Sequence, residues 1–186
     1  MSIVVVGGPS KGAGKTALIC GILAGLPERE WTAIKITSHA YRGVLLTEQV
    51  ARDPATDTGR YLLAGARRAP LVEAPMDEQL AVLARDGCDG DKNIVFESNR
   101  IVSYLTPDLC LGVVGEGSLP QKPSFAAFLA GVDGLVARAG VDVPAQYRKP
   151  GIPLFAMADL GCITPEFAEW MRARLSPRAR SEMARS

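Results

Sequence analysis

The residues with the clearest chemical meaning lie near the N-terminus, in the segment GGPSKGAGKT (7–16). Small residues let successive backbone N–H groups close around a phosphate, and a helix that starts there adds partial positive charge. Lys15 is then placed to reach the β- and γ-phosphates of a nucleotide, and the Thr16 hydroxyl to ligate Mg²⁺. The residues expected to contact the nucleotide are Gly8, Ser10, Lys11, Gly12, Ala13, Gly14, Lys15, Thr16 and Ala17. The segment therefore predicts a phosphate-binding loop (P-loop) for ATP or GTP with Mg²⁺.

The spacing of this loop departs from the common pattern G-x-x-x-x-G-K-[ST] by one residue. Pro9 stands where the first glycine is usual, and Gly8 precedes it, which gives G-x-x-x-x-x-G-K-T. Lys11, four residues before Lys15, has two interpretations. It is either a solvated or phosphate-facing lysine, or, as a resemblance to the extra lysine of the ParA/MinD ATPases implies, a lysine that reaches the nucleotide of a second copy in a dimer.

An acidic residue near Mg²⁺ is the second requirement of nucleotide chemistry, and it usually ends a neighbouring buried strand. Glu97 ends the apolar run NIVFE (93–97) and meets that description. We expect it to hold the water shell of Mg²⁺ or to polarise a nucleophile; the alternative is a glutamate at the exposed edge of a sheet. The predicted metal site is Thr16 with Glu97, and the predicted catalytic residues are Lys15, Lys35 and Glu97.

Four further residues are candidates for contacts with a second substrate. Lys35 and His39 lie at and just after the end of a predicted strand over 31–37, where ligands bind in open α/β sheets. Asp57 and Arg60 open the next predicted helix, where a substrate or metal contact is one interpretation and helix capping the other. Lys35 has the alternative of extending to solvent, and His39, the only histidine, that of an ordinary loop residue.

The elements that must position these residues alternate along the chain. Apolar runs predict strands over 2–7, 31–37, 71–73, 93–97, 108–114, 134–137 and 152–157, and helical periodicity covers 14–26, 57–69, 76–85 and 165–175. Residues 38–56 lack a clear period and are predicted to form a long loop. Alternating strands and helices favour a three-layer α/β/α domain with a mostly parallel central sheet, as in the P-loop nucleoside triphosphate hydrolases. We expect one domain over 1–175 and a basic tail over 176–186.

Composition excludes several classes of protein. With 21 basic and 20 acidic residues in 186, the net charge of +1 argues against a nucleic-acid or membrane-surface partner. No apolar run approaches the roughly 18 residues of a membrane helix. The cysteines (20, 88, 110 and 162) form no C-x-x-C pair, so we expect mostly buried, reduced thiols in a cytoplasmic protein.

Four segments together resemble the MobB family: GAGKT (12–16), AIKITSH (33–39), DTGRYLLAGARRA (57–69) and FE (96–97). The resemblance spans roughly residues 1–100 and implies the SIMIBI class of P-loop proteins, which also contains dethiobiotin synthetase and the ParA/MinD ATPases. The chain departs from the family in that Ser98 and Asn99 follow Glu97, where MobB usually has glycine. His39 also lies two residues later than in the family pattern. The sequence has no NKxD or TKxD element, so a preference for guanine is not supported.

The resemblance implies an accessory protein that binds a nucleotide and assists molybdenum cofactor (molybdopterin guanine dinucleotide) synthesis together with a cofactor-assembly protein. The longer loop resembles that of dethiobiotin synthetase, which implies a small-molecule kinase or ATP-dependent ligase with a second small-molecule substrate. The third alternative is a ParA/MinD-like ATPase switch that forms a homodimer. We expect an NTPase or phosphotransferase that acts on the γ-phosphate. A transferase should have a concave site lined by Lys35 and Glu97, and an adaptor an exposed apolar patch or a dimer surface.

Overall fold

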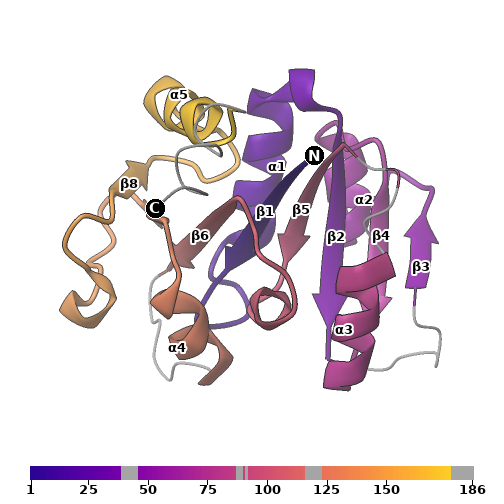
Figure 1. Ribbon diagram of the computed structural model, residues 1–186. Helices are drawn as coiled ribbons and strands as arrows, with labels where there is room; N and C mark the ends of the chain where they lie inside the picture. Colours follow the sequence, from indigo (N-terminus) through magenta and orange to yellow (C-terminus); the bar gives the residue numbers. More distant parts are fainter. Residues whose placement is uncertain (39–45, 87–89, 91, 116–122, 177–186) are drawn as a thin grey trace.

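The computed structural model describes residues 1–38, 46–86, 90, 92–115 and 123–176, and its centre is a single sheet (Figure 1). Eight strands are placed in the order β3-β4-β2-β5-β1-β6-β7-β8. Neighbouring strands run parallel, except that β3 is antiparallel to β4. The strands are β1 (Ser2–Gly7), β2 (Trp31–Thr37), β3 (Leu46–Gln49), β4 (Ala69–Glu73), β5 (Asn93–Glu97), β6 (Leu109–Val114), β7 (Gly134–Arg138) and β8 (Leu154–Met157).

Helices cover both faces of this sheet and confirm the predicted three-layer α/β/α architecture (Figure 1). Apolar side chains of α1 (Lys15–Gly25), α2 (Asp57–Leu63) and α5 (Pro165–Arg174) pack on one face. Those of α3 (Asp77–Asp86) and α4 (Pro123–Ala130) pack on the other. The described residues also contain short 3₁₀ helices: η1 (Pro27–Arg29), η2 (Ile101–Ser103) and η3 (Ala145–Tyr147).

The apolar side chains divide between the two faces of the sheet because successive side chains of a strand point to opposite faces. In β1, Val4 and Val6 enter the core under α1, whereas Ile3 and Val5 enter the core under α3 and α4. All six residues of β1 are buried, as expected for a parallel strand that is covered on both sides. The β-branched run that starts the chain is therefore the centre of the molecule.

Three predictions about elements were incomplete or wrong. The segment predicted as a loop over 38–56 contains the edge strand β3, which pairs with β4. The helix predicted over 57–69 ends at Leu63, because Gly65 adopts a φ of 103° and β4 begins at Ala69. No element was predicted where α4 lies.

The described cysteines are free, and their exposure differs from the expectation. Cys110 is buried and Cys20 is half-buried, but Cys162 is exposed. Cys88 lies outside the described residues, as does most of the tail predicted over 176–186. Within the described chain, no helix has the length and apolar character needed to cross a bilayer.

Candidate functional site

A cleft of about 1080 Å³ opens at the carboxyl ends of β1, β2 and β5, directly above the P-loop. These strands lie beside the point where the sheet order reverses, because β1 is flanked by β5 on one side and by β6 on the other. In open α/β sheets this is the usual place for a ligand. The cleft is lined by the P-loop, the end of β2, the start of α2 and the segments after β5 and before α4.

The P-loop connects β1 to α1 through tight backbone turns. Gly12 and Gly14 adopt φ values of 82° and 100°, which a residue with a side chain rarely tolerates. Gly14 is also the N-cap of α1, so the N-terminus of the helix faces the loop. The Lys15 ammonium donates to the Ser10 carbonyl at 2.8 Å and so folds back over the loop.

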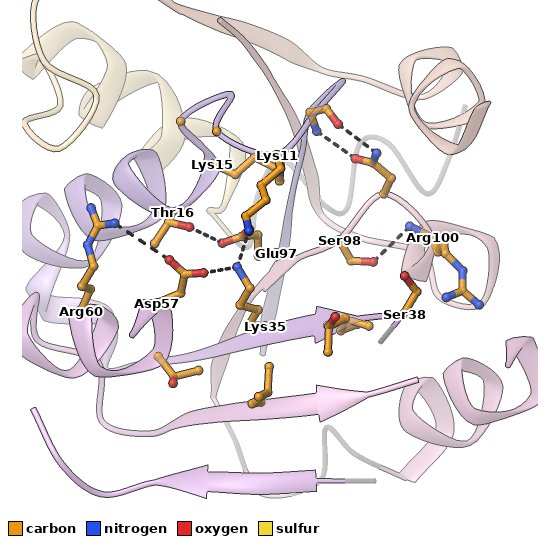
Figure 2. Close-up of a pocket in the computed structure, with 18 of the residues that line it drawn as sticks. Lys11, Lys15, Thr16, Lys35, Ser38, Asp57, Arg60, Glu97, Ser98 and Arg100 are labelled. Atoms are coloured by element: carbon orange, nitrogen blue, oxygen red, sulfur yellow. Dashed lines mark hydrogen bonds and ion pairs between the residues drawn. The ribbon is translucent and has the colours of Figure 1, made fainter. Parts of the chain in front are cut away.

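Glu97 lies at the centre of a polar cluster on the floor of the cleft (Figure 2). Its Oε2 accepts hydrogen bonds from the Thr16 hydroxyl at 2.8 Å and from the Tyr61 hydroxyl. Its Oε1 accepts from Lys35 Nζ at 3.1 Å. Because β5 lies between β2 and β1 and Glu97 is buried, the alternative of a glutamate at an exposed sheet edge is excluded.

The position of Lys35 follows from strand register. Lys35 of β2 lies opposite Glu97 of β5, so the two side chains leave neighbouring strands on the same face. The Lys35 ammonium also donates to Asp57 at the start of α2, and Arg60 lies 3.9 Å from the other oxygen of that carboxylate. A single ammonium thus connects two carboxylates (Figure 2).

The charges in this cluster shift one another's pKa. Burial lowers the pKa of Lys35, but the charge of Glu97 and the hydrogen bond to Asp57 outweigh it, so the pKa lies above its usual value. Burial raises the pKa of Asp57, but its bond to Lys35 outweighs this effect and leaves the pKa below the usual value. Burial and then the charge of Glu97 raise the pKa of Tyr61 well above 10.0. Lys35 and Asp57 are therefore charged near neutral pH, and Tyr61 keeps its proton.

Most residues predicted for the site come together in this cleft. Its lining includes Gly8, Lys11, Gly12, Gly14, Lys15, Thr16, Ala17, Lys35, Asp57, Arg60 and Glu97. Two predicted contacts are not in the lining: Ser10 takes part through its carbonyl, and Ala13 is buried. His39 lies outside the described residues.

Sequence reasoning missed three residues of the site. Tyr61 lies within the helix predicted over 57–69, and only the fold shows that its hydroxyl reaches Glu97. Asn99 was noted as a departure from glycine, yet it binds the backbone of Gly8. Ser124, at the start of α4, lines the cleft beside Asn99. The one available signal was the position of Asn99, two residues after the strand-ending acid.

Comparison with solved structures supports the architecture. A structure of LpxK from Aquifex aeolicus in complex with ATP matches with a TM-score of 0.52 at 16% identity, over 82% of this chain and 53% of that chain. The Signal Recognition Particle 54 kDa protein from Aeropyrum pernix K1, in complex with GDP, matches with a TM-score of 0.50 at 13% identity, over 99% of this chain and 48% of that one. This chain has the P-loop NTPase fold. It spans about half the length of both of these P-loop proteins.

A MobB homolog from Bacillus stearothermophilus has a similar length. It matches with a TM-score of 0.49 at 15% identity, over 94% of this chain and 98% of that chain. No protein-family model matches the sequence, and no curated protein matches it either.

Proposed function

We propose that this protein binds a Mg²⁺–nucleoside triphosphate at the P-loop and transfers the γ-phosphoryl group to a small molecule or to water. One observation carries the proposal. The P-loop residues Lys15 and Thr16 share a cleft with the Lys35–Asp57–Glu97 cluster, beside the reversal point of the sheet. Two lysines, two carboxylates and a hydroxyl are the groups that phosphoryl transfer needs, because its catalysis consists of positioning and charge stabilisation.

The loop itself fits a polyphosphate. A Cβ on Gly8 would lie 3.1 Å from the Val113 carbonyl oxygen, so a side chain at this position would crowd the backbone of β6. The positive φ values of Gly12 and Gly14 let the chain turn tightly before α1. The positive end of that helix and the Lys15 ammonium then face one bound anion.

The cluster also fits Mg²⁺. Among the described residues no group of three or more His, Cys, Asp or Glu side chains is arranged to hold a metal ion alone. Mg²⁺ commonly takes one or two carboxylates and completes its shell with water and substrate phosphates. Thr16, Glu97 and Asp57 supply such a set, and the Lys35 ammonium now lies between the two carboxylates, as a metal cation would.

Each residue then has a definite task. Lys15 leaves the Ser10 carbonyl and neutralises charge on the β- and γ-phosphates. Lys35, which lines the same cleft as Lys15 and contacts both carboxylates, would supply positive charge beside the transferred group. Tyr61 and Thr16 fix the orientation of Glu97 through their bonds to Oε2. Mg²⁺ held by Thr16, Glu97 and Asp57 would supply further charge stabilisation.

The extent of the cleft favours transfer to a second substrate. Beyond Lys35 the lining continues over Thr37 of β2, Thr47 of β3 and Leu71 of β4, with Arg100 near the other wall. This concave surface beside Lys35 and Glu97 matches what was expected of a transferase.

A second candidate is an accessory role in molybdenum cofactor assembly. Three segments that carry the sequence resemblance to MobB contribute Lys35, Asp57 and Glu97, and these side chains meet in one cluster. In this case binding is retained but hydrolysis is slow or absent.

The experiment is calorimetric titration of ATP and of GTP, each with Mg²⁺, into wild type, Lys15→Ala and Lys92→Ala. Lys92 is an exposed lysine at the opposite end of β5, so Lys92→Ala removes the same charge outside the cleft. We expect wild type and Lys92→Ala to bind one triphosphate equally and Lys15→Ala to lose it, with unchanged circular dichroism. Equal binding by Lys15→Ala would refute the assignment of the loop. Phosphate release with tight binding favours the transferase, and tight binding without it favours the accessory role.

A further inference from the structure

The segment after β5 holds the first glycine of the P-loop through a side-chain amide. The Gly8 N–H donates to Asn99 Oδ1 at 2.8 Å, and Asn99 Nδ2 donates to the Gly8 carbonyl at 3.0 Å. These bonds lie beyond the end of the β1–β5 ladder, where the Ser98 N–H donates to the Val6 carbonyl at 3.1 Å. The Asn99 side chain therefore extends the pairing of the two strands into the loop.

The orientation of this amide is fixed by its partners. Asn99 Nδ2 also lies 3.4 Å from the Ser124 hydroxyl at the start of α4, so both amide hydrogens and the oxygen have partners. Rotating the amide by 180° would set its NH₂ group against the Gly8 N–H and its oxygen against the Gly8 carbonyl. The asparagine amide supplies both the acceptor for the Gly8 N–H and the donor for the Gly8 carbonyl.

Gly8 in turn forms the surface on which the P-loop lysine lies. A Cβ built on Gly8 would be 3.1 Å from Lys15 Cγ and 3.2 Å from Lys15 Cδ. The aliphatic part of Lys15 is thus in close contact with the backbone that Asn99 holds. A shift of Gly8 would move the support of Lys15 and, with it, the ammonium at the end of the side chain.

We propose that Asn99 is a positioning residue for the phosphate-binding lysine, and that it sets the affinity of the P-loop for the triphosphate by holding Gly8 against Lys15. This inference rests on the proposed function. Asn99 acts through Gly8 and Lys15, and its link to Ser124 joins the P-loop to α4.

Two substitutions at this position separate its hydrogen bonds. Asn99→Ala removes both bonds to Gly8. Asn99→Asp keeps the size of the side chain and the acceptor for the Gly8 N–H, but it places a carboxylate oxygen against the Gly8 carbonyl. The matched control is Asn93→Ala, at the other end of β5, where Asn93 Nδ2 also donates to a backbone carbonyl, that of Arg29.

The measurements are the Kd of MgATP and of MgGTP by calorimetry, the KM and kcat of phosphate release, and the melting temperature. We expect Asn99→Ala to weaken binding of the preferred triphosphate about tenfold, with KM rising in parallel, since two hydrogen bonds that order the loop are lost. Asn99→Asp should weaken binding at least as much. Asn93→Ala should melt lower than wild type but bind within about twofold of it.

Each other outcome has a definite meaning. If Asn99→Ala has a lower melting temperature but the same triphosphate Kd as wild type, Asn99 contributes to stability alone and the inference is overturned. Equal weakening by Asn93→Ala would show a general loosening of β5 and overturn it too. If wild type binds neither triphosphate and equals Lys15→Ala, the proposed function fails and this inference with it. If Lys15→Ala loses the triphosphate and Asn99→Ala binds it as tightly as wild type does, only the role of Asn99 is rejected.

Discussion

Replacing Lys35 with methionine tests whether its ammonium stands where a metal cation would. The substitution keeps an unbranched side chain one atom shorter than lysine and removes the charge that joins Asp57 to Glu97. The two carboxylates then face each other without a cation between them. We expect Lys35→Met to be less stable than wild type without Mg²⁺, and to regain stability when Mg²⁺ is added.

The expected magnitude follows from the burial of the three side chains. Glu97 is 8% exposed, Lys35 23% and Asp57 37%. Breaking a buried ion pair by removing one partner costs about 3–5 kcal/mol. Because Asp57 keeps much of its water, we take about 3 kcal/mol, which lowers the melting temperature of a chain of this size by roughly 6–12 °C. Mg²⁺ at 100 times its Kd would restore about 2.7 kcal/mol.

The assay is urea unfolding of wild type and Lys35→Met in EDTA and in 10 mM MgCl₂ (on the order of a hundred times a sub-millimolar Kd). Equal stability of the two proteins in EDTA would refute the reasoning. So would an equal effect of Mg²⁺ on both, because wild type must displace Lys35 before the metal binds. Lys92→Met, at an exposed lysine, is the control for the loss of charge.

The pKa shifts in this cluster predict how the difference in stability between wild type and Lys35→Met depends on pH. The pKa of Asp57 is lowered in the folded protein, so its contribution is present above the unfolded value of about 3.9 and is lost as pH falls through the folded pKa. The pKa of Lys35 is raised, so its contribution is present below about 10.4 and is lost as pH rises through the folded pKa. The stability difference between wild type and Lys35→Met should therefore be largest near neutral pH, and should shrink as the carboxylates are protonated at low pH and as Lys35 loses its proton at high pH.

Three further substitutions test other parts of the structure. Glu97→Gln should raise the Mg²⁺ concentration needed for half-maximal nucleotide binding at least tenfold, as is typical when a metal-site partner is lost; an unchanged requirement in a magnesium titration would remove Glu97 from the metal site. Tyr61→Phe deletes a buried donor to Glu97 and should cost about 1.5–3 kcal/mol, seen as a melting temperature lowered by roughly 3–12 °C; a melting temperature equal to that of wild type would show that this bond contributes nothing. Thr164→Ala removes the hydroxyl that caps α5 and accepts from the Phe167 N–H at 3.3 Å, so calorimetric melting should show a loss of about 1 kcal/mol without any change in nucleotide Kd.

The parts that were predicted correctly depend on local signals. The buried strand β1, the glycine-rich loop and the helix after it follow one another without interruption, so their order gives the P-loop directly. Glu97 could be placed near this loop because the carboxyl ends of parallel strands meet at one edge of a sheet. The three-layer arrangement followed in the same way from the alternation of strands and helices.

The parts that were missed depend on contacts between distant residues. The four residues of β3 have no clear period and form a strand through antiparallel pairing with β4. Tyr61 has the periodicity of a core residue, and only the packing of α2 against the sheet brings its hydroxyl to Glu97. The contact of Asn99 with Gly8 joins residues 91 positions apart. No pattern within one segment contains that information.

The central place of β1 in the sheet has a consequence for biosynthesis. Its two neighbours, β5 and β6, pair with it through residues 91 and 105 positions further along the chain, as in Ser2–Asn93 and Val4–Leu109. At about 5–20 residues per second, a ribosome needs roughly 5–20 s to supply them. During that time an apolar strand has two open edges, which favours association with chaperones or with other nascent chains. A fragment that ends before Glu97 would contain the complete P-loop sequence and no folded P-loop.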